Sequence, residues 1–461
     1  MSVSNTHPEY DYAAPVWRRN RDAAAGQRCI VGSFETYFPP FVPEQQDRYN
    51  RVKQLARYYN ATGQTVTSLT GAAFNITPEI KLPQSIAYMT DDADGGGNDL
   101  EQVAKQTVAN VVTVGRHGLL ADYPATNGES LSQEDVERLG LRASIKQYPA
   151  ESGINWGEEN GRLSYVVLKE KQHLASNSFF DHSTEDVYRV YWMVGDECMT
   201  AVLKEGQAIE DAANATPVLD ANGDAFDVIP FVFVGAIDNR VSVDAAPIEG
   251  LANTNIAHFQ TSCNHVETVS KQGQVTNAFD PGDIDTQTFQ EANGLQKGQP
   301  IAIGSDSAYI FGTGGKITTS TAPETTLALT DLELLEKQMQ SQGAQLMDKS
   351  AGGQTKTAKQ AGIEAKQQVS QMQNAVLNTS DALRQCLGWC ERMMSKTPTG
   401  EIVYEIDTTF SDDGYDPEIG NTLLAAKDRG LLSTAEIRPY LARIPGIELD
   451  DTGLDDAMEG R

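Results

Sequence analysis

The sequence predicts an α+β fold, and three observations support this prediction. Apolar residues recur at steps of three or four in several segments, as in amphipathic helices. Between residues 141 and 246 the pattern changes to alternating β-branched and aromatic residues, which is typical of antiparallel strands. The chain has 461 residues, enough for about three domains of ~150 residues each.

Composition and charge exclude several classes of protein. The chain has 36 Lys and Arg against 64 Asp and Glu, a net charge of −28, which excludes a general electrostatic grip on a phosphate backbone. Its 39% hydrophobic content is low, so we expect part of the apolar burial to occur at subunit contacts. Five scattered cysteines predict no disulfide framework and synthesis in a reducing cytoplasm. We expect neither a signal peptide nor a membrane span.

The N-terminal half alternates helical and extended patterns. After an arginine-rich opening, residues 47–74 predict two helices with a break near Gly63. Asp99 followed by Gln102 predicts the start of an amphipathic helix that ends near Gly115. The next segment, GLLADYP, predicts a short buried strand. Residues 141–246 then predict a mostly antiparallel β region.

The C-terminal half is mainly helical. Residues 248–272 carry Ile256, Phe259, Cys263 and Val266 on one near-heptad stripe, and the other faces are polar but hardly charged. Such a helix is predicted to pack against neighbouring copies of itself. A turn-rich stretch, a helix at 325–347 and a very long helix at 357–394 follow, and EIVYEID predicts a strand after them.

No motif of catalysis or cofactor binding is convincing. GTGGKIT at 312–318 lacks the spacing of a phosphate loop, and the acidic loop 91–99 lacks the final acid of a calcium loop, so both favour turns. Cys386 and Cys390 lie one turn apart, which favours packing over metal binding. We therefore expect no cofactor, no metal and no enzymatic activity, although a weak cation site in the 91–99 loop stays open.

The order of segments resembles the portal proteins of tailed bacteriophages, most closely an uncharacterised portal-associated family of phage proteins. Stretches spread from residue 7 to residue 395 carry the resemblance. They are HPEYDYAAPVWRRNRDAAAGQ, VTSLTGAAFNITPEIKLP with DDADGGGNDLEQ and VVTVGRHGLLADYP, IPFVFVGAIDNRVSVDAAPIEGLANTNIAHFQTSCNHVETV, and LEKQMQSQGAQLMDKSAGGQTKTAKQAG.

This resemblance implies a portal-like α+β subunit, with an α/β wing, a helical stem, a small clip, a long wing helix and a crown-like end, assembled as a ring of usually twelve copies. The implied boundaries are a wing at 1–247, a first stem helix at 248–272, a clip at 273–323, a second stem helix at 324–347, a tunnel loop at 348–356, a long wing helix at 357–395 and a crown-like region at 396–461. The stripe Ile256, Phe259, Cys263 and Val266 would pack between subunits.

The resemblance also implies a function and partners. The ring would sit at one capsid vertex of the virion, made in the host cytoplasm, with double-stranded DNA passing through it during packaging and ejection. The major capsid protein, the terminase large subunit and a head-tail adaptor would be its partners, and no membrane is implied. We hypothesise that Lys349 and Lys356 face the DNA from the tunnel loop, with Lys316 as the alternative. A minor capsid or adaptor protein is the alternative function.

Overall fold

The computed structural model divides the chain into two compact units. It describes residues 2–40, 46–124, 141–174, 180, 182–212, 215–272, 276–295, 309–320, 326–347 and 371–408. The first unit comprises Met1–Ala13, Thr67–Pro247 and Gln345–Arg461, and the second comprises Ala14–Val66 and Ile248–Ala344. This division cuts across the predicted wing at 1–247, because residues 14–66 group with the second unit.

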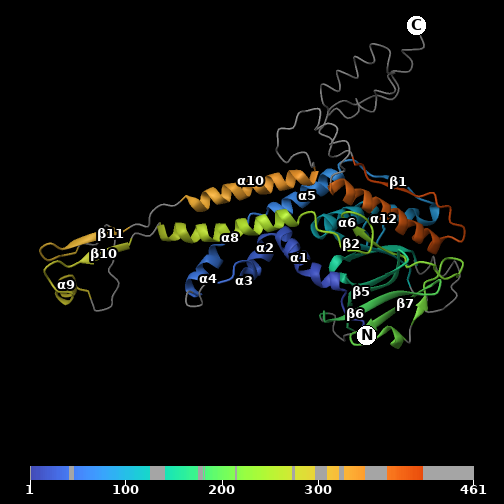
Figure 1. Ribbon diagram of the computed structural model, residues 1–461, viewed down its shortest axis with the longest axis horizontal. Helices are drawn as coiled ribbons and strands as arrows, with labels where there is room; N and C mark the ends of the chain where they lie inside the picture. The colour runs from blue at the N-terminus through green and yellow to red at the C-terminus, as the bar shows by residue number, and fades with distance from the viewer. Residues whose placement is uncertain are drawn as a thin grey trace, which may run out of the picture. The chain divides into compact units, whose positions relative to one another are not determined.

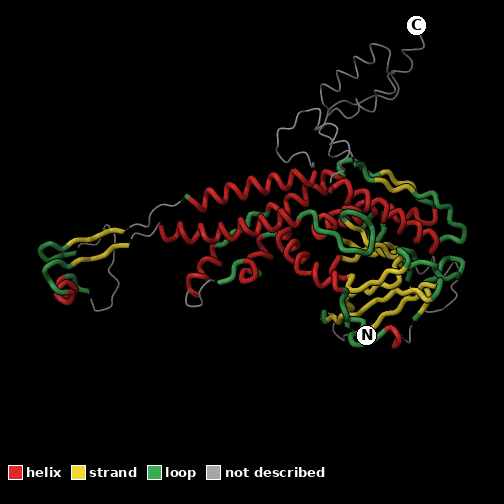
Figure 2. The backbone as a smooth tube through the Cα atoms, in the orientation of Figure 1, coloured by secondary structure: helices red, strands yellow, loops and turns green. Residues whose placement is uncertain are grey.

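The two larger sheets of the first unit are antiparallel, and Figures 1 and 2 show them beside helices α6 and α12. In the smaller sheet, β2 (Arg116–Asp122) lies between β3 (Ser144–Pro149) and β9 (Phe231–Gly235). The larger sheet has the sequential order β4 (Gly153–Glu159), β5 (Arg162–His173), β6 (Thr184–Val194), β7 (Glu197–Lys204) and β8 (Thr216–Pro217). The predicted antiparallel β region and the buried strand at GLLADYP are confirmed.

Short elements complete this unit. They are β1 (Glu79–Lys81), paired with β12 (Val403–Glu405), and the 3-10 helices η2 (Gln84–Thr90), η3 (Ala150–Ser152) and η4 (Ile209–Asp211). The predicted strand EIVYEID thus forms β12, whose partner lies more than 300 residues earlier in the chain.

Helix α6 (Leu100–Val114) begins and ends where the sequence predicts. The Asp99 side chain accepts a hydrogen bond from the Gln102 backbone N–H, and Gly115 ends the helix in the left-handed conformation with φ 77°. A side chain at Gly115 would also clash, because a Cβ there would lie 2.6 Å from the Asp244 carbonyl oxygen. These signals are local in sequence, which is why they could be read in advance.

Helix α12 (Gln371–Met394) packs with α6 against the smaller sheet. Its predicted apolar stripe is buried at Met372, Val376, Thr379, Leu383, Cys386 and Cys390. This confirms the stripe for the part of the helix that is described. The predicted start of the helix, at 357–370, lies outside the described residues.

The second unit is helical except for one hairpin. Its helices are α2 (Gln27–Gly32), α3 (Phe34–Tyr37), α4 (Gln46–Leu55), α8 (Glu249–Gln272) and α9 (Thr286–Ala292), and the hairpin pairs β10 (Thr276–Asp280) with β11 (Lys316–Ser320). Three helices continue across the boundary between the units: α1 (Pro8–Ala25), α5 (Ala61–Ala73) and α10 (Leu327–Met347).

The break between α4 and α5 lies at residues 56–60, so the predicted break near Gly63 is wrong. Asn60 caps α5 by accepting a hydrogen bond from the Gly63 N–H at 2.9 Å, which places Gly63 in the first turn. A Cβ at Gly63 would lie 2.2 Å from the Ala24 carbonyl oxygen. Glycine is present there because α1 approaches closely, and a close approach cannot be distinguished from a helix break in sequence alone.

Within the described residues, no helix combines the length and the apolar character needed to cross a membrane.

Candidate functional site

The helix–hairpin–helix segment from α8 to α10 is the candidate functional site, since the sequence predictions converge on it. On α8, Ile256, Phe259 and Cys263 are 8%, 0% and 1% exposed. They belong to a cluster of the second unit's own core that includes Ala23, Ile30, Phe34, Tyr49 and Val52. The rings of Phe259 and Phe34 meet edge to face with centroids 5.9 Å apart.

These three side chains are therefore occupied inside the subunit, which differs from the predicted contact between subunits. The physical reason is that α2, α3 and α4 cover the stripe, and a side chain already enclosed by its own chain has no apolar area left for a second copy. Val266, the fourth predicted residue, is half-buried.

A buried asparagine on α8 joins the helix to the α4–α5 connection. Asn255 is fully buried, and its Oδ1 accepts hydrogen bonds from the Tyr58 hydroxyl at 2.7 Å and from the Thr62 N–H and hydroxyl at 3.0 and 2.9 Å. Its Nδ2 donates to the Tyr59 carbonyl at 2.7 Å. The sequence places Asn255 on a polar face, but its partners lie almost 200 residues away and could not be predicted.

The opposite face of α8 contacts α10. His258 Nε2 lies 3.4 Å from a Glu336 carboxylate oxygen, and the Thr261 hydroxyl donates to Asp331 at 3.0 Å. A Cβ at Gly250 would lie 3.8 Å from the Gln342 side chain. As the residue number rises along α8, the number of its neighbour on α10 falls, so the two helices run antiparallel.

The part of the chain that connects the end of α8 to the start of α10 forms a small module with its own aromatic core. β10 and β11 pair in register from Thr276 opposite Ser320 to Asp280 opposite Lys316. Phe279 meets Tyr309 with ring centroids 5.5 Å apart, and Phe289 of α9 meets Phe311 at 5.3 Å. GTGGKIT forms the turn into β11, where the Gly315 N–H donates to the Gly312 carbonyl. This matches the predicted turn.

The three lysines of the tunnel-loop hypothesis have separate outcomes. Lys316 is exposed at the start of β11, so it belongs to the hairpin module. Lys349 and Lys356 lie outside the described residues. Their proposed role therefore stays a prediction.

Arg116, in the first unit, belongs to no sequence motif, yet it has a structural role. The side chain is almost fully buried, with its guanidinium 3.4 Å from the ring centroid of Phe233 and 4.2 Å from that of Trp156. It donates to the carbonyls of Val241 and Ser242, in the segment that leads to α8. Burial lowers the pKa of Arg116 to about 9. Arg116 thus fixes this segment on the sheet.

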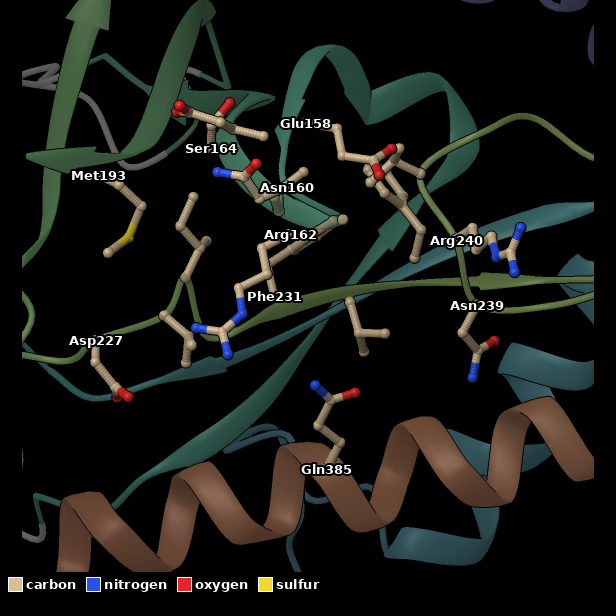
Figure 3. Close-up of a pocket in the computed structure, with 18 of the residues that line it drawn as sticks. Glu158, Asn160, Arg162, Ser164, Met193, Asp227, Phe231, Asn239, Arg240 and Gln385 are labelled. Carbon is tan, nitrogen blue, oxygen red and sulfur yellow. The ribbon is translucent and has the colours of Figure 1, made fainter. Parts of the chain in front are cut away.

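A cavity of about 1040 Å³ opens in the first unit between the sheets and α12. Figure 3 shows Arg162 of β5 and Gln385 of α12 extending into the same space. Arg392 on its wall is fixed by an ion pair with Asp227 at 3.1 Å and by the ring of Phe226, 4.3 Å away. The described lining includes acids and bases but neither histidine nor cysteine.

The 91–99 loop uses its carboxylates for its own turn. Asp94 accepts hydrogen bonds from the Gly96 and Asn98 N–H groups at 2.7 and 3.2 Å, and Asp92 accepts one from the Gly97 N–H at 2.9 Å. Partial burial acts to raise the pKa of Asp94, but these hydrogen bonds and nearby Lys146 outweigh it and lower that pKa. Among the described residues, no group of three His, Cys, Asp or Glu could hold a metal.

Four of the five cysteines, Cys198, Cys263, Cys386 and Cys390, are buried in this structure. All five are free of disulfide bonds. Burial raises the pKa of Cys263 and of Cys198 to about 12, and burial likewise raises the pKa of both Cys386 and Cys390. A thiol that stays protonated at neutral pH is a poor nucleophile and metal ligand. Their arrangement is that of apolar core residues.

Comparison with known proteins adds one family match. A family model described as a domain of unknown function (DUF4055) matches residues 247–394. This match begins just before α8 and ends with α12, so it contains the whole helix–hairpin–helix segment. No curated protein matches the chain.

Three solved chains cover most of this one at low similarity. One comes from the neck of a native gene transfer agent particle with C12 symmetry, at 12% identity and a TM-score of 0.40, covering 84% of this chain and 90% of that one. The others come from the native virion, at 10% identity and 0.40, with 84% and 90% coverage, and from the neck of the empty particle, at 10% and 0.38, with 84% and 91% coverage. TM-scores below 0.5 do not by themselves assign a fold or a role.

Proposed function

We propose that this chain is the subunit of a portal, the ring-shaped head-to-tail connector at one capsid vertex of a tailed phage. The observation that carries the proposal is the antiparallel pair α8 and α10, joined through a hairpin module with its own aromatic core. In a portal this order corresponds to stem, clip and stem. The sequence resemblance, which spans residues 7–395, supports the same order.

The charges of the segment suit a DNA channel. α10 carries three acids and one base, and α8 carries two acids and one base in 24 residues. Phosphate groups are held by cationic surfaces, and a weakly charged or acidic wall lets a duplex slide. A chain with net charge −28 would therefore conduct DNA without binding it tightly.

The proposal also names binding partners and an activity that the chain itself is not expected to have. About twelve copies would form the ring, with the major capsid protein, the terminase large subunit and a head-tail adaptor as its contacts in the virion. The terminase would supply the motor activity, so the purified chain is proposed to hydrolyse no ATP.

Negative-stain electron microscopy with light-scattering mass on the same sample tests the proposal. A ring with a central opening wide enough for duplex DNA is the expected result. A homogeneous monomer or a filament over the accessible concentration range would contradict it and would favour the adaptor or minor capsid alternative.

The tunnel lysines have a separate test in packaging. Reversing the charge of both Lys349 and Lys356 to glutamate is expected to change DNA packaging while rings still assemble. The same reversal at Lys316 is the comparison, because Lys316 lies in the hairpin module. Packaging that is unchanged by the double reversal and altered by Lys316→Glu would move the role to the hairpin.

A further inference from the structure

The cavity beside α12 has an apolar floor. Ile229, Phe231 and Phe233 line it and are each only 4% exposed, so their rings and chains are held in place by the rest of the unit. Its volume of about 1040 Å³ lies at the upper end of the range for ligand pockets, about 300–1,000 Å³. Every residue of its described wall belongs to the first unit. The cavity therefore has room for several side chains of a bound molecule.

The charged side chains of the wall divide into a paired and an unpaired set. Arg392 pairs with Asp227 at 3.1 Å, and Arg240 pairs with Asp238 at 3.5 Å. Arg392 is the main cause of the lowered pKa of Asp227, to which Arg162 adds only the weakest contribution. Four side chains of the wall have no hydrogen bond and no ion pair with a described residue: Arg162, Glu158, Glu159 and Asp196.

The three unpaired acids, Glu158, Glu159 and Asp196, are here called the acidic rim. Glu158 and Glu159 are the last residues of β4, and Asp196 lies in the turn between β6 and β7. All three are exposed. Once the paired charges are set aside, the cavity therefore presents one cation at Arg162 together with the acids of the rim.

α12 adds two hydrogen-bond donors to the same wall. Trp389 lines the cavity and is 8% exposed, yet its indole N–H donates to no described residue, although a buried indole N–H usually finds an acceptor. Gln385 lies one turn earlier on the same helix face, and its amide likewise has no partner among the described residues. Figure 3 shows Gln385 and Arg162 extending into the same space. Arg162, Gln385 and Trp389 are here called the donor cluster, and it needs an acceptor.

We propose that this cavity binds a peptide segment of a partner protein in which an acidic side chain is flanked by basic ones. The carboxylate of that acid would accept hydrogen bonds from the donor cluster, since arginine–carboxylate pairs are strong and often bidentate. The flanking lysines or arginines would meet the acidic rim, and apolar parts of the segment would pack on the floor at Phe231. This inference concerns the first unit and does not depend on the portal proposal.

A segment of mixed charge fits the wall better than ligands of one charge do. A nucleic acid or a purely acidic peptide would reach Arg162 but would be repelled by the acidic rim. A purely basic peptide would suit the rim but would face Arg162 and leave the indole N–H of Trp389 without an acceptor. Only a ligand that carries both charges satisfies the donor cluster and the rim together.

Fluorescence anisotropy with the full-length chain and a labelled peptide, Lys-Leu-Glu-Leu-Lys, tests the proposal. Two matched peptides carry Gln or Lys in place of the central Glu. The buffer contains ~0.15 M salt, where charges beyond about 8 Å are largely screened. Arg162→Glu reverses the central charge of the cavity, and Lys171→Glu, at an exposed position of the same strand outside the wall, is the matched control. Circular dichroism verifies that each variant is folded.

We expect the wild type to bind the Glu peptide at least about 10-fold more tightly than the Gln peptide, because the carboxylate gains charged hydrogen bonds. The net charge of −28 favours the opposite order, so this preference can only come from a local site. Arg162→Glu should prefer the Lys peptide, and Lys171→Glu should behave as the wild type. Trp389→Phe removes only the indole N–H and should weaken binding of the Glu peptide by about 2- to 10-fold.

Three results would overturn the inference. The first is a wild type that binds the peptides equally or not at all, and the second is a folded Arg162→Glu variant that keeps the preference for the Glu peptide. The third is displacement of the peptide by an equal concentration of free glutamate, which would mean that the cavity takes small carboxylates. Ring formation, which tests the portal proposal, is measured separately and is not predicted to depend on Arg162.

Discussion

Helices α8 and α10 lie side by side in the same unit but use their apolar residues differently. The apolar stripe of α8 is enclosed by α2–α4, and its opposite face contacts α10. α10 buries Met339 and Leu346 but leaves Leu327 and Leu334 in solvent. The difference teaches that a regular apolar repeat does not identify its partner. The repeat of α8 is satisfied within the chain, whereas two leucines of α10 are exposed.

The largest expected effect compares one residue from each helix. Phe259→Ala removes a fully buried ring from α8 and should lower the free energy of unfolding by about 3–5 kcal/mol. Leu334→Ala removes an exposed side chain from α10 and should change it by less than ~0.5 kcal/mol. Urea unfolding of both variants, at a concentration where the chain is monomeric, measures the difference. Equal losses in the free energy of unfolding for the two variants would contradict the difference between α8 and α10.

A smaller effect is expected from the polar contacts of α8. Asn255→Ala leaves the N–H and the hydroxyl of Thr62 buried without their acceptor and should cost about 1–3 kcal/mol. Asn253→Ala, at an exposed position on the same helix, is the control and should change stability by only a few tenths of a kcal/mol. The same urea experiment applies. An Asn255→Ala variant with the free energy of unfolding of the wild type would show that this hydrogen-bond network does not stabilise the packing of α8.

The smallest expected effect is the pH dependence of stability that two acids of the first unit contribute. Because these acids should affect folding and not association, they distinguish the two properties. Burial raises the pKa of Asp122, although Arg189 and Lys146 oppose this, so stability is lost as pH rises from 3.8 through the raised value. Asp122→Asn should therefore raise the melting temperature at pH 7 and have little effect below pH 3.8.

Asp94 has the opposite sign. Its pKa is lowered, so its contribution is present above pH 3.8 and is lost as pH falls through the lowered value. Asp94→Asn should lower the melting temperature at pH 7, and the difference should fade in acid. Neither change is expected to alter association, because both residues belong to the first unit, away from the helix–hairpin–helix segment. Thermal unfolding from pH 3 to pH 7 with sedimentation at pH 7 measures both properties.

Predictions from local signals were accurate, and those that needed a partner were not. The Asp99 cap, the Gly115 stop and the buried stripe of α12 follow from residues within a few turns of one another. The predicted break near Gly63 is misplaced, because glycine is needed there for the close approach of the Ala24 carbonyl oxygen of α1. The seven-residue helix α9 was not predicted, since its seven residues hold too few apolar positions to show a helical period.

The sequence by itself determined where most of the helices and strands run, because caps, turns and apolar periods act over short distances along the chain. It also determined the acidic balance and the order of two helices with a turn-rich stretch between them. The tertiary structure alone decided which apolar faces are occupied. That Phe259 meets Phe34 and that Asn255 meets Thr62 depend on segments about 200 residues apart, which sequence spacing does not encode.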